Sequence, residues 1–183
     1  MIYCFLADGF EEIEALATVD VLRRAGLSVQ TVSVNGTKFV TGSHNIKVEA
    51  DIVSADIEIN ATECAIYPGG MPGSETLSSG DDKTPTVVAK YCAENGLLIG
   101  AICAAPLVLG RLSLLENKNA TCYPGFENEL KGATYTGEKV TVDGKFVTGR
   151  GPGCSLDFAF TLVALLKDEE TALEIRKAMQ CDD

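Results

Sequence analysis

A cysteine that follows a short apolar run is the residue in this chain best placed for chemistry. Residues 97–99 are all apolar, which is typical of a strand buried on both faces of a sheet. Residues 104–109 follow as a helical segment, in which Pro106 fits the first turn. Cys103 is therefore expected at a sharp strand-to-helix turn, the geometry of a nucleophile elbow with sulfur in place of a serine oxygen.

Two interpretations of this cysteine remain open on this stretch alone. Its small neighbours leave the sulfur accessible: Gly100, Ala101, Ala104 and Ala105. A helix N-terminus stabilises an anion, so we expect the pKa of the Cys103 thiol to fall below the ordinary value of about 8.5. The alternative is a buried and inert cysteine, because most free cysteines are of that kind.

A carboxylate near the N-terminus is the second candidate. Asp8 and Glu11 resemble a capping box for a helix that runs to about residue 25 and stops at Gly26. Glu11 and Glu12 are explained by the favourable charge of acidic residues in a first helical turn. Glu14 differs, because it heads a largely apolar stripe at helical spacing.

Burial against that stripe predicts a desolvated Glu14. Desolvation raises the pKa of a carboxyl group, so Glu14 could hold a proton at neutral pH. A solvated carboxylate in the first turn is the alternative, since glutamate side chains are rarely buried.

Two further segments have a functional and a plain interpretation. His44 lies in a loop between the expected hairpin strands 39–41 and 46–48, where a histidine is most often merely solvated. The expected strand 64–67 runs into the Gly-rich turn 68–73, which allows close backbone approach to a ligand and is equally compatible with a simple turn. This turn is neither a dinucleotide-binding fingerprint nor a Walker loop.

The expected helices and strands alternate along the chain. Further helices are expected at 85–94, 156–166 (with Ser155 as N-cap) and 168–179, and a hairpin at 140–148. This alternation predicts a three-layer α/β sandwich around a mostly parallel sheet. Sites in such sheets form at the carboxyl ends of strands, and Glu14, the Gly69-Gly70 turn and Cys103 each follow such an end.

Composition excludes several classes of function. The 183 residues fit one domain, and a net charge of −11 without any basic block argues against a nucleic-acid-binding protein. We find no membrane-spanning run and expect no signal peptide. Seven cysteines without a C-x-x-C pair indicate free thiols in a reducing cytoplasm, and a single histidine excludes a multi-His metal cluster.

Five separated motifs together resemble the ThiJ/PfpI family, and most closely its DJ-one-like branch. They span nearly the whole chain in order: ADGFEEIEA at 7–15, VLRRAG at 21–26, YPGGMPG at 67–73, IGAICAAP at 99–106 and TGRGPGCS at 148–155. The resemblance implies a flavodoxin-like fold of the class I glutamine-amidotransferase type and a homodimer. It implies no metal and no cofactor.

The resemblance also implies roles for individual residues. Cys103 matches a reactive cysteine hydrogen-bonded to a protonated glutamate, which falls on Glu14. The backbone pocket of the family matches Gly69, Gly70 and Ala104. Two positions near the site that are often arginine match Arg24 and His44, of which the second would reach the site across the dimer. The loop that lines the pocket matches Arg150 and Pro152.

The chain departs from the family at one pocket position. The family usually has histidine before the proline that is Pro124 here, and this chain has Tyr123. Tyrosine has an ordinary pKa near 10 and is a poor base at neutral pH. Without that histidine, a Cys-His-Glu amidotransferase triad and a protease are both disfavoured.

Two functions from different classes follow from these observations. The first is a cofactor-independent glyoxalase or deglycase, in which the Cys103 thiolate adds to methylglyoxal-type aldehydes while Glu14 relays protons. The second is a non-catalytic thiol sensor or chaperone-like stress protein, in which Cys103 is oxidised to a sulfinate. The same pocket would serve either function.

Overall fold

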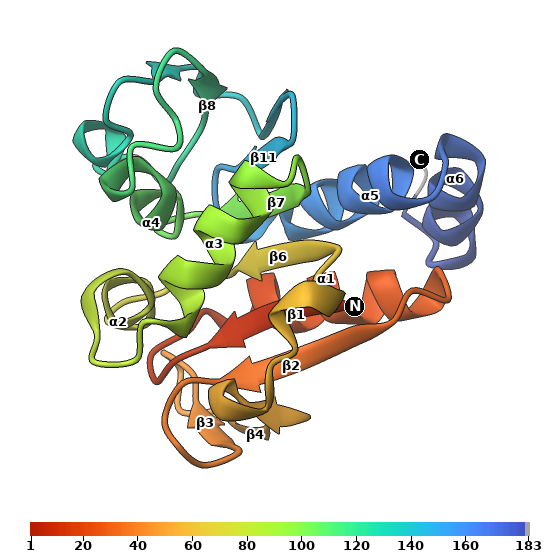
Figure 1. The fold of residues 1–183 in the computed structure, drawn as a ribbon. Coiled ribbons are helices and arrows are strands. Elements are labelled where there is room, and N and C mark those ends of the chain that lie inside the picture. The colour runs from red at the N-terminus through yellow and green to blue at the C-terminus, as the bar shows by residue number, and fades with distance from the viewer. Residues whose placement is uncertain (182–183) are drawn as a thin grey trace.

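The computed structural model describes residues 1–181, which are built around a seven-stranded sheet (Figure 1). The strands lie in the order β10-β11-β7-β6-β1-β2-β5, and every pair is parallel except β10 and β11. Their bounds are β1 Ile2–Leu6, β2 Val29–Ser33, β5 Ile52–Val53, β6 Cys64–Tyr67, β7 Leu98–Ile102, β10 Val140–Asp143 and β11 Phe146–Gly149. Two small two-stranded sheets stand apart, formed by β3 Phe39–Thr41 with β4 Lys47–Glu49 and by β8 Asn119–Ala120 with β9 Thr134–Tyr135.

Helices cover both faces of the central sheet, so the three-layer α/β arrangement is confirmed. One apolar core packs α1 Glu12–Arg24, α5 Ser155–Leu166 and α6 Glu169–Ala178 against the sheet. The other core packs α2 Gly73–Ser79, α3 Thr84–Glu94 and α4 Pro106–Arg111. Four short 3-10 turns complete the elements: η1 Ser54–Asp56, η2 Ile59–Ala61, η3 Glu127–Glu129 and η4 Pro152–Cys154.

The central strands are buried on both faces, as their unbroken apolar runs predict. All five residues of β1 and all five of β7 are buried, which is the usual state of inner strands in a parallel sheet. Helix α1 packs extensively on α5, and α5 also contacts β7 and β11. The sheet therefore forms a rigid base from which the loops at its carboxyl edge project.

The start of α1 differs from the expected capping box. Glu11 is the N-cap, because its Oε2 accepts a hydrogen bond from the Glu14 N–H at 2.8 Å. Asp8 instead accepts from the backbone N–H of Thr41 at 2.8 Å and so holds the β3 segment. Between them the chain turns at Gly9, which has a φ of +84° that glycine adopts without strain. The helix therefore begins one turn later than a cap at Asp8 would place it.

Other helix boundaries also differ from those expected from the sequence, because local hydrogen bonds set them. Ser155 is the first residue of α5 and its hydroxyl donates to the Pro152 carbonyl at 2.8 Å, so the prediction that it caps the helix is wrong. Asp168 caps α6 by accepting from the Thr171 N–H. Helix α2 was not expected, because its sequence is rich in serine and glycine.

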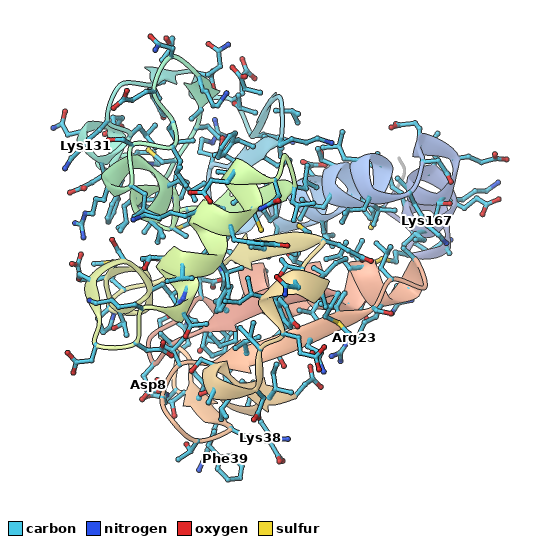
Figure 2. The ribbon with its side chains drawn as sticks, in the orientation of Figure 1. Asp8, Arg23, Lys38, Phe39, Lys131 and Lys167 are labelled. Carbon is cyan, nitrogen blue, oxygen red and sulfur yellow. The ribbon has the colours of Figure 1, made fainter. Side chains whose placement is uncertain are left out.

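The β3–β4 hairpin was expected and lies at one end of the molecule. Its strands pair antiparallel with Val40 opposite Val48. Phe39 projects from it into solvent (Figure 2), and Ile46 in the connecting loop is also exposed. Over residues 1–181, no helix combines the length and the apolar character that crossing a bilayer requires.

Candidate functional site

Three chain segments that are distant in sequence meet at the carboxyl edge of the sheet. Strand β6 pairs with β1 on one side and with β7 on the other, so the loops that follow these strands are neighbours. Gly69 lies between the other two candidates, because a Cβ built there would stand 2.5 Å from both Cys103 Cβ and Glu14 Oε2. The structure therefore brings Glu14, Gly69 and Cys103 together, and it leaves no room for a side chain at position 69.

Cys103 sits in an elbow between β7 and α4. Its φ of +65° falls in the left-handed region, which costs a residue with a side chain about 1–2 kcal/mol. Two hydrogen bonds hold this conformation, one from the Cys103 N–H to the Gly149 carbonyl and one from the Tyr123 N–H to the Cys103 carbonyl, both 2.8 Å. Strained backbone of this kind persists where the surrounding structure holds it, often at a functional site.

The sulfur of Cys103 lies among polar partners although the residue is only 8% exposed. The backbone N–H groups of Ala104 and Gly70 hydrogen-bond to it, and so does the carboxyl group of Glu14. Gly70 has a φ of +88° and packs against the backbone of the turn before α1. A hydrogen bond of 2.9 Å from the Glu11 N–H to the Gly69 carbonyl fixes that contact.

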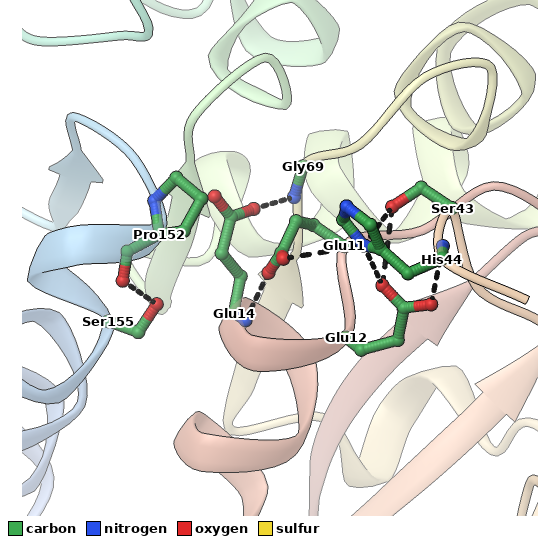
Figure 3. Close-up of polar contacts among 8 residues, drawn as sticks. All are labelled: Glu11, Glu12, Glu14, Ser43, His44, Gly69, Pro152 and Ser155. Carbon is green, nitrogen blue, oxygen red and sulfur yellow. Dashed lines mark hydrogen bonds and ion pairs between the residues drawn. The ribbon is translucent and has the colours of Figure 1, made fainter. Parts of the chain in front are cut away.

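Glu14 is completely buried, so the desolvated interpretation is confirmed and the solvated one is wrong. Its Oε2 accepts from the Gly69 N–H at 2.7 Å (Figure 3). Its Oε1 is buried without a nitrogen or oxygen partner, and the Cys103 side chain is the remaining partner of the carboxyl group. Burial raises the pKa of Glu14 to about 7. The hydrogen bonds with Cys103 and Gly69 act in the opposite direction and lower this pKa, whereas the negative charge of Glu11 makes a smaller contribution that raises it.

The expected lowering of the thiol pKa is wrong. Burial, followed by the negative charge of Glu14, raises the pKa of Cys103, and the N–H groups of Ala104 and Gly70 only partly oppose this. The helix dipole is weak here, because α4 has six residues and begins three positions beyond the cysteine. What stabilises a thiolate at this site is local hydrogen bonding, and it requires a neutral Glu14.

Cys103 and Glu14 consequently titrate as a pair. One proton leaves as the pH rises through about 7, the pKa of Glu14. The remaining proton is held much more tightly, because removing it would place two negative charges side by side in a buried site. Near neutral pH the pair therefore holds one proton and one negative charge, with N–H donors beside both the sulfur and the carboxyl group.

A second polar cluster includes Glu12, two positions before Glu14 in α1, and was missed in the sequence. The carboxylate of Glu12 accepts from the backbone N–H of His44 at 2.7 Å and contacts His44 Nδ1 at 2.7 Å (Figure 3). Although burial opposes ionisation, these hydrogen bonds lower the pKa of Glu12 to about 2. The pairing raises the pKa of His44. Glu12 and His44 are 32 residues apart, so no local pattern could reveal the contact.

This cluster is a satisfied ion pair, and its geometry differs from a hydrolytic triad. Ser43 Oγ lies 3.1 Å from His44 Nδ1, the same ring nitrogen that contacts Glu12. A serine nucleophile would need the opposite ring nitrogen. Glu11, Glu12 and His44 also form a group of potential metal ligands, with one ligand atom of each within 4.8 Å of the others.

The remaining candidates divide into two groups. Arg24 pairs with Asp20 at 2.7 Å near the end of α1, about 15 Å along the helix from Glu14, so this chain does not bring it to Cys103. Tyr123, Arg150 and Pro152 line a common pocket of ≈ 330 Å³. That pocket adjoins the cysteine through the Tyr123 backbone.

Comparison with known proteins gives a consistent result across the chain. The DJ-1/PfpI family model matches residues 1–165. The chain is 42% identical over 172 residues to Protein DJ-1 homolog B of Arabidopsis thaliana, covering 93% of this chain and 39% of that protein. It is 33% identical over 176 residues to Protein dj-1beta of Drosophila melanogaster, covering 95% of this chain and 93% of that protein. The chain thus spans well under half of the plant relative.

Solved structures show the same similarity in three dimensions. Oxidized DJ-1 of Toxoplasma gondii superposes with a TM-score of 0.92 at 35% identity, covering 98% of this chain and 97% of that one. A cysteine-to-alanine mutant of a DJ-1 superfamily protein from Salmonella typhimurium gives 0.91 at 30% identity, with the same coverage of both chains. The fold is therefore the flavodoxin-like α/β fold.

We predict that Cys103 is the first thiol modified when the native protein meets limiting iodoacetamide. Its labelling rate should rise with pH to a plateau, with a midpoint near the pKa of about 7 of Glu14, because the singly ionised pair forms there. Peptide mass spectrometry across pH 5–9 would measure this. The Glu14→Gln variant should still be labelled but should lose that midpoint. Preferential labelling of Cys4 or Cys181 would contradict the assignment.

Proposed function

The chain belongs to the DJ-1/PfpI family, and we propose that it is a cysteine-dependent glyoxalase or deglycase acting on methylglyoxal-type aldehydes without a cofactor. The observation that supports this most is the buried Cys103–Glu14 pair, which combines a nucleophile with a carboxyl group of pKa about 7. A group with a pKa near the working pH is the best general acid–base catalyst.

In the first step the Cys103 thiolate adds to the aldehyde carbon. A C–S bond forms, the C=O double bond becomes a single bond, and the negative charge moves to oxygen. The N–H groups of Gly70 and Ala104, which contact the sulfur, are within reach of an oxygen on the carbon attached to it. Glu14 then donates its proton to this alkoxide and gives a hemithioacetal.

Glu14 carries the later proton transfers. Its carboxylate removes the hydrogen on the former aldehyde carbon as a proton, which gives an enediol when the neighbouring carbonyl oxygen is protonated. The proton is then returned to the neighbouring carbon while the hydroxyl group on the former aldehyde carbon loses its proton, so that a C=O bond forms there and a thioester of a 2-hydroxy acid results. Water then cleaves the thioester and releases the acid and the thiol, so methylglyoxal plus water becomes lactate. Tyr123 lacks the imidazole that many relatives would place beside this reaction, so Glu14 is the acid–base group of the proposed mechanism.

The turnover of three variants tests the mechanism. Glu14→Gln keeps a hydrogen-bond donor but cannot accept a proton, so the rate of methylglyoxal consumption should fall by about 10²–10⁴. Tyr123→Phe should change the rate little, because an unionised phenol contributes little. His44→Ala is the control, since the imidazole pairs with Glu12. If Glu14→Gln turns over normally and His44→Ala does not, the base is His44.

A redox sensor is the second candidate, and one observation favours it. The structure of the Toxoplasma gondii relative is that of an oxidized protein. In this chain two peroxide molecules could each transfer one oxygen to the Cys103 thiolate and leave as water, giving a sulfinate. The N–H groups of Gly70 and Ala104 and a protonated Glu14 would hold its oxygens.

Mass spectrometry of peroxide-treated protein separates the two candidates. A sensor should gain two oxygen atoms at Cys103 under mild peroxide and should not consume methylglyoxal. An enzyme should consume methylglyoxal and should lose that activity in proportion to sulfinate formation. Full activity in protein whose Cys103 is completely oxidised would contradict both proposals.

We also propose a homodimer in the cytoplasm, as the resemblance and the free thiols suggest. The exposed apolar side chains of Ile13 and Leu16 on α1 and of Phe39 and Ile46 on the hairpin support this, because such side chains are usually covered in an interface. The residues 39–48 would then lie near the interface.

Analytical ultracentrifugation at micromolar concentration tests the dimer. The wild-type protein should sediment as a dimer, and Ile46→Asp should shift it toward monomer because a charge would be buried without a partner. Leu173→Asp, on the exposed side of α6, is the matched control and should leave the dimer intact. A wild-type monomer would contradict the proposal.

A further inference from the structure

The pocket next to Cys103 has an unusual charge for this protein. The chain carries a net charge of −11. Three other cavities each have at least one carboxylate in their walls. The pocket of ≈ 330 Å³ has none, and its walls include the cations Arg150 and Lys139 beside Tyr123 and the loop 151–154. The local charge is therefore opposite in sign to that of the whole molecule.

We propose that this pocket binds an anionic group of the substrate, so that the preferred substrates are 2-oxoaldehydes that carry a carboxylate. The inference rests on the proposed function and names the substrate class of the same site. Cys103 would attack the aldehyde end while the carboxylate lies toward Arg150. A neutral aldehyde such as methylglyoxal would then use only part of the binding surface.

The backbone ties the pocket closely to the cysteine. Arg150 directly follows Gly149, whose carbonyl accepts from the Cys103 N–H at 2.8 Å. The Tyr123 N–H donates to the Cys103 carbonyl at the same distance. Pro152 also forms part of the pocket wall. These backbone contacts place a wall of the pocket next to the Cys103 elbow, and the proposal requires a substrate of a few carbon atoms to span from the sulfur into the pocket.

Arg150 is the main source of the positive charge. Its Nη1 donates to the Gly137 carbonyl at 2.9 Å, and within residues 1–181 it forms no ion pair. The positive charge of Lys139 is partly neutralised, because its Nζ lies 3.4 Å from Asp157 Oδ2. The planar guanidinium group matches the two oxygens of a carboxylate, whereas the half-exposed ring of Tyr123 offers an apolar wall for the carbon chain.

Two substrates with the same five-carbon chain test the inference through turnover. 4,5-Dioxopentanoate and 2-oxopentanal have the same chain length and differ in a terminal carboxylate against a methyl group. The wild-type kcat/KM should be higher for 4,5-dioxopentanoate than for 2-oxopentanal. Added salt should lower the ratio of the two kcat/KM values, anion over neutral aldehyde, by screening. Arg150→Gln and Lys139→Gln should each lower the ratio, Arg150→Gln by about threefold, as expected for a unit charge several ångströms away in water.

Lys145→Gln is the matched control. Lys145 immediately precedes β11 and Arg150 immediately follows it, so the two lie about 17 Å apart on the same strand. Removing the Lys145 charge should leave the ratio unchanged. A wild-type ratio of one or less, or a ratio that neither pocket variant alters, overturns the inference.

Alkylation keeps this test independent of catalysis. Iodoacetate and iodoacetamide are nearly isosteric and differ in charge, so the ratio of their rates reports the local charge at a thiol. The ratio should be higher at Cys103 than at the partly exposed Cys181 of the same protein, and Arg150→Gln should reduce it. Equal ratios at both cysteines overturn the inference. If the protein turns over neither aldehyde, the proposed function is wrong but the anion-binding pocket is not thereby refuted. The alkylation ratio then tests whether the pocket favours an anion.

Discussion

A single proton held between two buried groups is the constraint on which the site depends. Glu14 is completely buried and Cys103 almost so, and water can therefore do little to stabilise a charge on either. One negative charge is tolerated because backbone N–H groups of Gly69, Gly70 and Ala104 point at the carboxyl group and the sulfur. A second negative charge would have no comparable set of hydrogen-bond donors to stabilise it.

The parallel sheet supplies the precision that this arrangement needs. Strands β1, β6 and β7 end side by side, and the segments that follow them approach more closely than side chains would permit. Glycine at positions 69 and 70 makes that approach possible. Glu11 connects two of the segments, since its N–H donates to Gly69 and its side chain caps the helix at Glu14. Glu11, which the sequence explained by helix charge and a capping box with Asp8, thus also connects the Gly69 turn to the start of α1.

Two features distinguish the chemistry available to this chain. Tyr123 stands where the family resemblance implies a histidine, so the proposed mechanism assigns the acid–base work next to the sulfur to Glu14. The lone histidine does not replace it, because His44 pairs with the buried Glu12 and ties the hairpin to α1. Oxidation and aldehyde addition both begin from the same thiolate, and the donors around it suit an alkoxide or a sulfinate alike.

The sequence by itself determined the fold class and the three segments of the site. Apolar runs such as residues 98–102 and the alternation of helices with strands are local patterns, and parallel strands necessarily bring their carboxyl ends together. The apolar stripe below Glu14 raised the possibility of a desolvated carboxyl group with a raised pKa, and the structure decided between this interpretation and a solvated one. Only the tertiary structure decided the direction of the Cys103 pKa, the ion pair of Glu12 with His44, and the separation of Arg24 from the site. Each of these depends on burial or on groups far apart in the chain, and no local pattern encodes the distance between them.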